Sequence, residues 1–151
     1  RCIRISDSGN KEDYNFNTVY ENLYIDINTP VKIGGGSRDL LNIETITSGI
    51  KLIYDINPVF GSPGIPYTEV TYDESSHSLK LLFEEFKINK TEEKHISFED
   101  IDNTYGQNIL LIRKDSNCTI SIDLGRDVKY YNINEYVIHD DKVVIAEITF
   151  K

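Results

Sequence analysis

The 151-residue chain has little of what helices require: it contains one alanine, one glutamine and no methionine. These residues are among the strong helix formers, so their shortage disfavours a helical fold. Tryptophan is also absent, and two cysteines are too few for a disulfide framework or a cysteine-rich zinc site. With 4 prolines and 9 glycines the chain is neither collagen-like nor of low complexity. No apolar run approaches the roughly 18 residues of a membrane-spanning helix, so we expect no membrane insertion.

Basic residues are in the minority. The chain holds 16 lysines and arginines against 25 aspartates and glutamates, a formal net charge of −9. An acidic domain repels the phosphates of nucleic acids and of anionic membranes, so neither is an expected partner. The charge instead favours a protein partner with a basic or apolar contact surface.

Residues that suit β-strands are abundant, since Ile, Val, Thr, Tyr and Phe make up 56 of the 151 positions. Apolar and polar residues alternate along many segments, and short polar clusters separate these segments at intervals of roughly 8 to 12 residues, as in antiparallel sandwiches and barrels. The pattern predicts strands over 2–6, 19–28, 41–47, 50–56, 67–72, 78–88, 95–100, 108–114, 118–124, 130–138 and 142–150. We therefore predict an all-β fold: one antiparallel β-sandwich domain over residues 1–151, with a β-barrel as the alternative and at most one short helix, at 37–42.

Signals of cellular location are few. The chain begins at Arg1 without a signal-like apolar stretch, so we expect that any targeting segment has been removed. Asn89 and Asn117 each begin an N-x-T glycosylation tripeptide, and Cys2 and Cys118 form a pair in number. We predict a secreted, cell-surface or virion-surface protein with a Cys2–Cys118 disulfide. The alternative is a cytosolic domain with two free thiols.

The most distinctive segment is 57–67, which holds three of the four prolines together with Val59, Phe60, Ile65 and Tyr67. Prolines stiffen a loop, and large apolar side chains on a stiff loop suit a protein interface. We predict that these four side chains bind the partner. The alternative is a crossover between two sheets, with Phe60 and Ile65 covering the core.

Known catalytic and metal-binding motifs are missing. The glycines at 34–36 match no phosphate-binding loop, and the segment from Asp100 fails as an EF-hand at its glycine and final glutamate positions. We expect a non-enzymatic module without cofactor, metal or catalytic residues that binds a protein such as a receptor, ligand or adhesion partner.

Two other functions stay open. The first is a carbohydrate-binding module that stacks sugars on Tyr130 and Tyr131 or on Tyr67 and Tyr72. Its calcium-dependent form would use acidic residues from separate loops, namely Asp100, Asp102, Asp140 and Asp141. The second is an enzyme whose acidic catalytic residues are dispersed along the chain.

Overall fold

The computed structural model describes residues 3–4, 14–15, 24–56, 64–98 and 104–151. Thirteen strands are present in this part of the chain, and no helix. They are β1 (Ile3–Arg4), β2 (Tyr14–Asn15), β3 (Ile25–Asp26), β4 (Val31–Ile33), β5 (Leu40–Ile46), β6 (Gly49–Asp55), β7 (Thr68–Asp73), β8 (Ser78–Glu84), β9 (Glu92–Ser97), β10 (Gly106–Lys114), β11 (Asn117–Leu124), β12 (Tyr130–Ile138) and β13 (Val143–Phe150).

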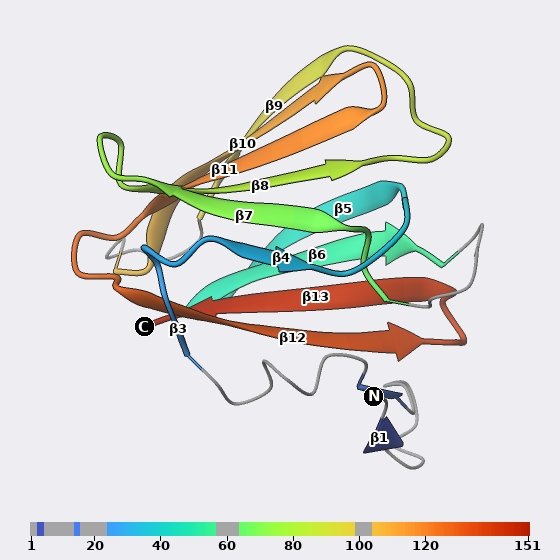
Figure 1. Cartoon of the computed structure of the whole chain (residues 1–151), viewed down its shortest axis with the longest axis horizontal. Coiled ribbons are helices and arrows are strands. Elements are labelled where there is room, and N and C mark those ends of the chain that lie inside the picture. The colour runs from blue at the N-terminus through green and yellow to red at the C-terminus, as the bar shows by residue number, and fades with distance from the viewer. Residues whose placement is uncertain (1–2, 5–13, 16–23, 57–63, 99–103) are drawn as a thin grey trace.

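The strands form two antiparallel sheets that pack face to face (Figure 1). Sheet A has seven strands in the order β1-β2-β12-β13-β6-β5, with β3 also paired to β12. Sheet B has six strands in the order β4-β7-β8-β11-β10-β9. The sheets do not close into a barrel, so the predicted β-sandwich is confirmed and the barrel alternative is excluded.

The core lies between the sheets and follows from the alternation of the sequence. In β11, Cys118, Ile120, Ile122 and Leu124 are buried, while the residues between them face outward. Ile120 lies opposite Leu81 of β8 and opposite Leu111 of β10, so apolar side chains of neighbouring strands share one face. The segment 37–42, considered as a short helix, instead leads into β5.

Position 49 must be a glycine because β6 and β13 pack closely there. The sequence placed the β5–β6 turn at Ser48-Gly49, whereas the turn residues are Thr47 and Ser48, and Ser48 has a φ of 63°. Gly49 already belongs to β6, and a Cβ there would lie 2.0 Å from the carbonyl oxygen of Ile148 in β13. Only glycine permits this close approach of the two strands.

The predicted disulfide is absent. Cys118 is a free thiol with no exposed surface, and its side chain lies among core residues between the sheets. Cys2 lies outside the described residues. The two glycosylation candidates, Asn89 and Asn117, are exposed, and their modification stays a prediction.

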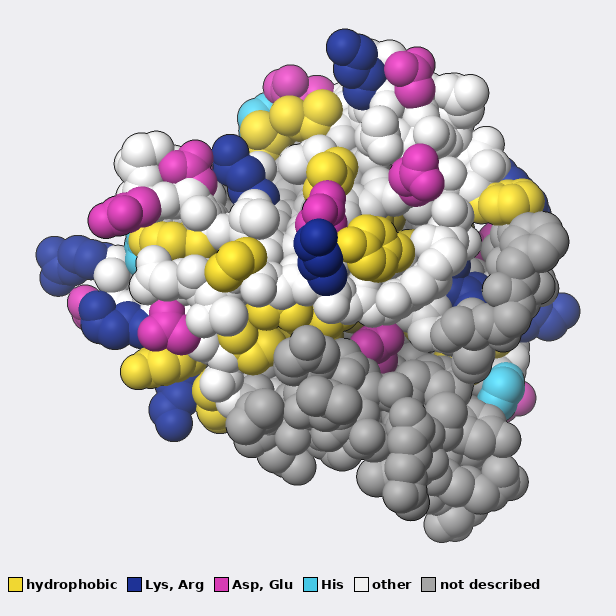
Figure 2. Space-filling view, viewed as in Figure 1, with side chains coloured by type: hydrophobic (Ala, Val, Ile, Leu, Met, Phe, Trp, Pro, Cys, Tyr) yellow, Lys and Arg dark blue, Asp and Glu magenta, His cyan; other side chains and the backbone are white. Residues whose placement is uncertain are grey.

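Charged and apolar side chains are interspersed over the face of the molecule in Figure 2. The described residues contain no helix with the length and hydrophobicity needed to cross a membrane.

Candidate functional site: a groove between two edge strands

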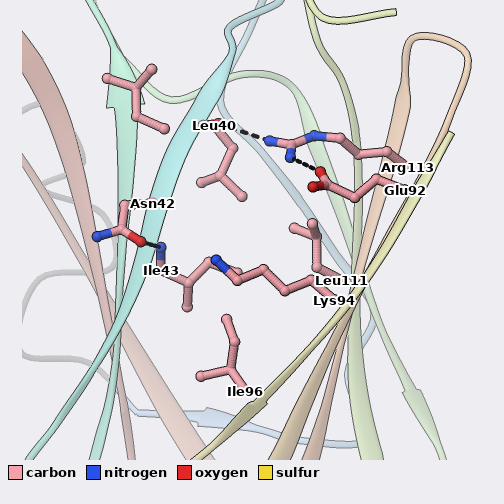
Figure 3. Close-up of a pocket in the computed structure, with 9 residues that line it drawn as sticks. Leu40, Asn42, Ile43, Glu92, Lys94, Ile96, Leu111 and Arg113 are labelled. Carbon is pink, nitrogen blue, oxygen red and sulfur yellow. Dashed lines mark hydrogen bonds and ion pairs between the residues drawn. The ribbon is translucent and has the colours of Figure 1, made fainter. Parts of the chain in front are cut away.

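A groove of about 190 Å³ lies between β5 of sheet A and β9 of sheet B (Figure 3). Each of these strands is the last in its sheet among the described residues, since β5 pairs only with β6 and β9 only with β10. Side chains from both strands and from β10 point into the space between them (Figure 3). The groove is lined by Leu40, Leu41, Asn42, Ile43, Glu92, Lys94, Ile96, Leu111 and Arg113.

Apolar core residues form the floor of the groove, while polar side chains such as Asn42, Glu92 and Lys94 make up most of its exposed lining. Leu40, Ile43 and Leu111 belong to the buried core, and Ile96 is half-buried against it. Leu41 differs from them, because a β-bulge between Leu40 and Asn42 leaves its side chain 54% exposed. Because Leu40, Ile43 and Leu111 are almost completely buried, an apolar side chain from outside would contact mainly Ile96 at the floor of the groove.

A buried ion pair closes one end of the groove. Arg113 on β10 donates from Nε to Glu85 Oε1 at 2.7 Å and from Nη2 to Glu85 Oε2 at 3.1 Å. Its Nη1 donates to Glu92 Oε1 of β9 at 2.5 Å. Burial disfavours the charge on Arg113, but the hydrogen bonds to Glu85 and Glu92 outweigh this effect and raise the arginine pKa. The hydrogen bond from Arg113 also lowers the pKa of Glu92.

The same pair fixes the start of β5 by holding both backbone groups of Leu40. The Leu40 N–H donates to Glu85 Oε2 at 2.9 Å, and the Leu40 carbonyl accepts from Arg113 Nη2 at 2.8 Å. Sheet A and sheet B are thus joined through side chains at this end of the groove. The first backbone groups of the β5 edge are already used and cannot pair with an added strand.

The two residues before β5 make this junction rigid. Asp39 Oδ1 accepts backbone N–H groups of Phe86, Lys87 and Ile88 at 2.7, 2.8 and 3.3 Å. Arg38 donates to backbone carbonyls on the core side, including that of Gly64 at 2.6 Å, and burial lowers its pKa. One wall of the groove is therefore held in place before any ligand arrives.

Further along β5 the edge is only lightly protected. The Ile43 N–H is bonded at 2.9 Å by the side chain of its own neighbour Asn42, a contact that an incoming carbonyl can replace. Two-residue hairpin geometry places the N–H and C=O of Thr45, like those of Ile43, on the side away from β6. Across the groove, Lys94 makes no ion pair within the described part of the chain.

The segment predicted to bind a partner is only partly described. Val59 and Phe60 lie outside the described residues, while Ile65 is 2% exposed and belongs to the core, so its predicted contact with a partner is wrong. The Ile65 N–H donates to Glu135 Oε1 at 3.2 Å. Tyr67 is 44% exposed. The residues from Gly64 to Tyr67 enter β7 of sheet B and pack as a crossover.

The glycines at 34–36 support this crossover. The Gly35 N–H donates to the Ile65 carbonyl at 3.1 Å, and the Tyr67 N–H donates to the Gly36 carbonyl at 3.1 Å. Gly34 has a φ of 78°, and a Cβ there would lie 2.3 Å from the Pro66 oxygen. Gly34 therefore allows the two backbones to approach each other, which is a structural role.

The residues considered for calcium and sugar binding do not form one site among the described residues. Asp140 and Asp141 are exposed in the β12–β13 turn, whereas Asp100 and Asp102 lie outside the described residues. Where the structure describes the chain, no three His, Cys, Asp or Glu residues gather as a metal site. Tyr130 is exposed, and Tyr131 is fully buried.

The sequence contained a signal for the ion pair that its interpretation missed. Arg113 follows Ile109 and Leu111 at two-residue spacing, so its side chain must lie on the same inward face of the strand as these core residues. A buried arginine needs a carboxylate partner, and Glu85 directly follows a strand of the same sheet.

Comparisons of the chain with protein-family models, with curated proteins and with solved structures find no match, so the function is inferred from the groove and the surfaces described above.

Proposed function

We propose that this protein is a non-enzymatic binding module that recognises another protein by taking an extended segment of it into the groove between β5 and β9. The observation that carries the proposal is that two edge strands border one groove, which has an apolar floor and a polar rim. Edge strands offer backbone N–H and C=O groups to an added strand, and pockets beside them select its side chains.

The chemistry of the groove defines the partner segment. Backbone groups of β5 beyond Leu40 would pair with the segment, while the half-buried Ile96, with Ile43 beneath the surface beside it, would receive one of its apolar side chains. Glu93 on β9 and Glu44 on β5 are exposed near the groove without lining it, and the whole chain carries a net charge of −9. An apolar segment with basic flanking residues is complementary to this surface.

A surface-exposed or extracellular setting remains part of the proposal. The exposure of both glycosylation candidates, Asn89 and Asn117, is compatible with it. The free thiol of Cys118 gives it no support, because the disulfide that favoured export is absent.

The test is a selection of binding peptides from a random-peptide display library on the intact protein. The selected peptides should be extended, apolar and basic at their ends. On binding they should shift the backbone amide resonances of Leu40–Ile46 or Glu92–Ser97. Failure to enrich any peptide, or shifts confined to other strands, would contradict the proposal.

Two variants connect binding to the groove. Leu41→Asp places a charge at the exposed bulge, and Thr45→Pro removes a donor that points away from β6. Each should weaken peptide binding about tenfold or more. Leu82→Asp is the matched control, since Leu82 is 41% exposed on the outer face of β8, away from the groove. Equal loss of binding in all three variants would point to a different surface.

A further inference from the structure

We infer that a second pocket, at the other end of the sandwich strands, binds a neutral sugar residue of a glycan. This pocket measures about 230 Å³ and lies where the β7–β8 turn of sheet B meets β3 and the start of β12 in sheet A. These segments lie at the left end of the molecule in Figure 1. The residues that carry the inference are Asp26, Asn28, Tyr72, Glu74, Lys129 and Tyr130.

The wall from sheet B is held rigidly by His77. Its Nε2 lies 2.8 Å from the Gly125 carbonyl, which can only accept, so Nε2 carries the proton. In the neutral ring Nδ1 then accepts from the Tyr72 hydroxyl at 2.6 Å. The rings of Tyr72 and His77 are perpendicular, with centroids 5.6 Å apart. The proton of the Tyr72 hydroxyl is thereby donated to His77, and the Tyr72 ring is fixed as a wall of the pocket.

His77 itself adopts an uncommon backbone conformation, with a φ of 51°. Its carbonyl accepts from the Leu124 N–H at 3.0 Å, so both its backbone and its ring join the β7–β8 turn to the end of β11. Non-glycine residues in this region are maintained when the surroundings hold them firmly. The turn that forms one side of the pocket is therefore fixed by several contacts.

The opposite wall is fixed through its backbone. The Ile27 N–H donates to the Lys129 carbonyl at 3.0 Å, and Tyr130 exchanges backbone hydrogen bonds with Lys151, both at 2.9 Å. Asp26 Oδ1 accepts from the backbone and the side chain of Asn28 at 2.9 and 3.1 Å. This arrangement leaves Asn28 Oδ1 and Asp26 Oδ2 as acceptors, while the ring of Tyr130 is 42% exposed.

The polar groups of the pocket favour a neutral ligand with several hydroxyls. Glu74 and Lys129 line the pocket from two different loops and form no ion pair with another described residue, so their charges are available to a ligand. One ammonium against the carboxylates of Asp26 and Glu74 disfavours a phosphate. The carboxylates of Asp26 and Glu74 and the amide oxygen of Asn28 supply fewer oxygen ligands than the roughly six to eight that calcium takes.

The volume and the lining of the pocket limit the class of ligand further. The pocket has the volume of roughly eight water molecules at about 30 Å³ each, which suits a single sugar ring. Its apolar surface comes from Ile27, Val128 and the two tyrosine rings, and an aromatic ring can stack against the C–H face of a sugar. Planar carboxylate and amide groups around such rings can bond neighbouring hydroxyls. A terminal monosaccharide of a glycan is the ligand class that satisfies these features together.

The test is binding of the intact protein to an array of plant, animal and microbial oligosaccharides in buffer with EDTA. We expect binding to glycans that share one terminal monosaccharide, and competition by that monosaccharide in free form. Tyr130→Ala should weaken the binding by about tenfold, the loss expected for one aromatic contact, and Glu74→Gln should also weaken it. Tyr67→Ala is the matched control, because Tyr67 is 44% exposed at the opposite end of β7.

Three results would overturn the inference: no glycan bound, binding unchanged in both pocket variants, or binding that requires calcium. Leu41→Asp, which alters the β5–β9 groove, should leave glycan binding unchanged. If that variant loses peptide binding and keeps glycan binding, the groove and this pocket are independent binding sites, and the two proposals are tested separately.

Discussion

Arg113 and Glu85 face each other in a buried ion pair with two direct contacts, of 2.7 and 3.1 Å, and together they hold the N–H and C=O of Leu40. The pair thus joins β10 and the end of β8 in sheet B to the start of β5 in sheet A. Burial removes both charges from water, which costs free energy that their mutual attraction offsets only while both partners are present.

Removing one partner of this pair leaves the other buried and uncompensated, so the stability losses of the two single variants should not add. Glu85→Gln or Arg113→Met should lower the free energy of unfolding by about 3 to 5 kcal/mol, since each leaves a buried charge or donor unpaired. The double variant should lose less than the sum of the two. Urea unfolding followed by circular dichroism measures this, with Lys32→Met in the exposed Lys32–Glu69 pair as a control that should change stability by less than about 1 kcal/mol. Additive losses would contradict the coupling.

Cys118 should be chemically inert in the native protein. Burial raises the pKa of its thiol from an ordinary 9.0 to about 12, and the nearby carboxylate of Glu85 adds to this effect. In a Cys2→Ser variant, which leaves Cys118 as the sole thiol, a thiol-reactive dye should react only after denaturant is added. Rapid reaction of the folded protein would show that the thiol is accessible.

The same thiol makes the protein less stable in alkali. The unfolded chain loses the Cys118 proton above pH 9 while the folded protein keeps it, so the unfolded state gains stability as the pH rises. We expect the free energy of unfolding to fall by about 1 kcal/mol more between pH 9 and pH 10 in the wild type than in Cys118→Val. Parallel pH curves for the two proteins would show that the pKa of Cys118 is not raised.

The close approach of Gly34 to Pro66 predicts a sharp difference between neighbouring glycines. Gly34→Ala combines a φ of 78° with a Cβ 2.3 Å from a backbone oxygen, so it should cost more than the about 1 to 2 kcal/mol of the left-handed conformation alone. Gly35→Ala is the control, because nothing lies within 4 Å of its added Cβ. Thermal unfolding of both variants measures the difference. Equal melting temperatures would contradict the close contact.

The strands were predictable because alternation is a local property of the chain. The strands expected over 118–124 and 130–138 correspond closely to Asn117–Leu124 and Tyr130–Ile138. The groove was not predictable, because it depends on which strands end each sheet, and the alternation along β5 and β9 does not encode strand order. Arg113 shows the intermediate case: its phase marks it as inward-facing, but its pairing with Glu85 depends on the fold.

The last prediction concerns the crossover, for which the sequence suggested either a protein interface or a cover over the core, and the structure buries one of the proposed contacts. Ile65 is 2% exposed and lies in the core, whereas Tyr67, two residues later, is 44% exposed. Ile65→Ala should therefore lower the free energy of unfolding by about 2 to 5 kcal/mol, since it leaves a cavity beside the buried carboxylate of Glu135. Tyr67→Ala should change it by less than about 1 kcal/mol, as is usual for surface positions. Urea unfolding of the two variants side by side measures both values. A stable Ile65→Ala variant that had lost binding to a protein partner would instead place Ile65 at an interface and restore the role that the sequence suggested.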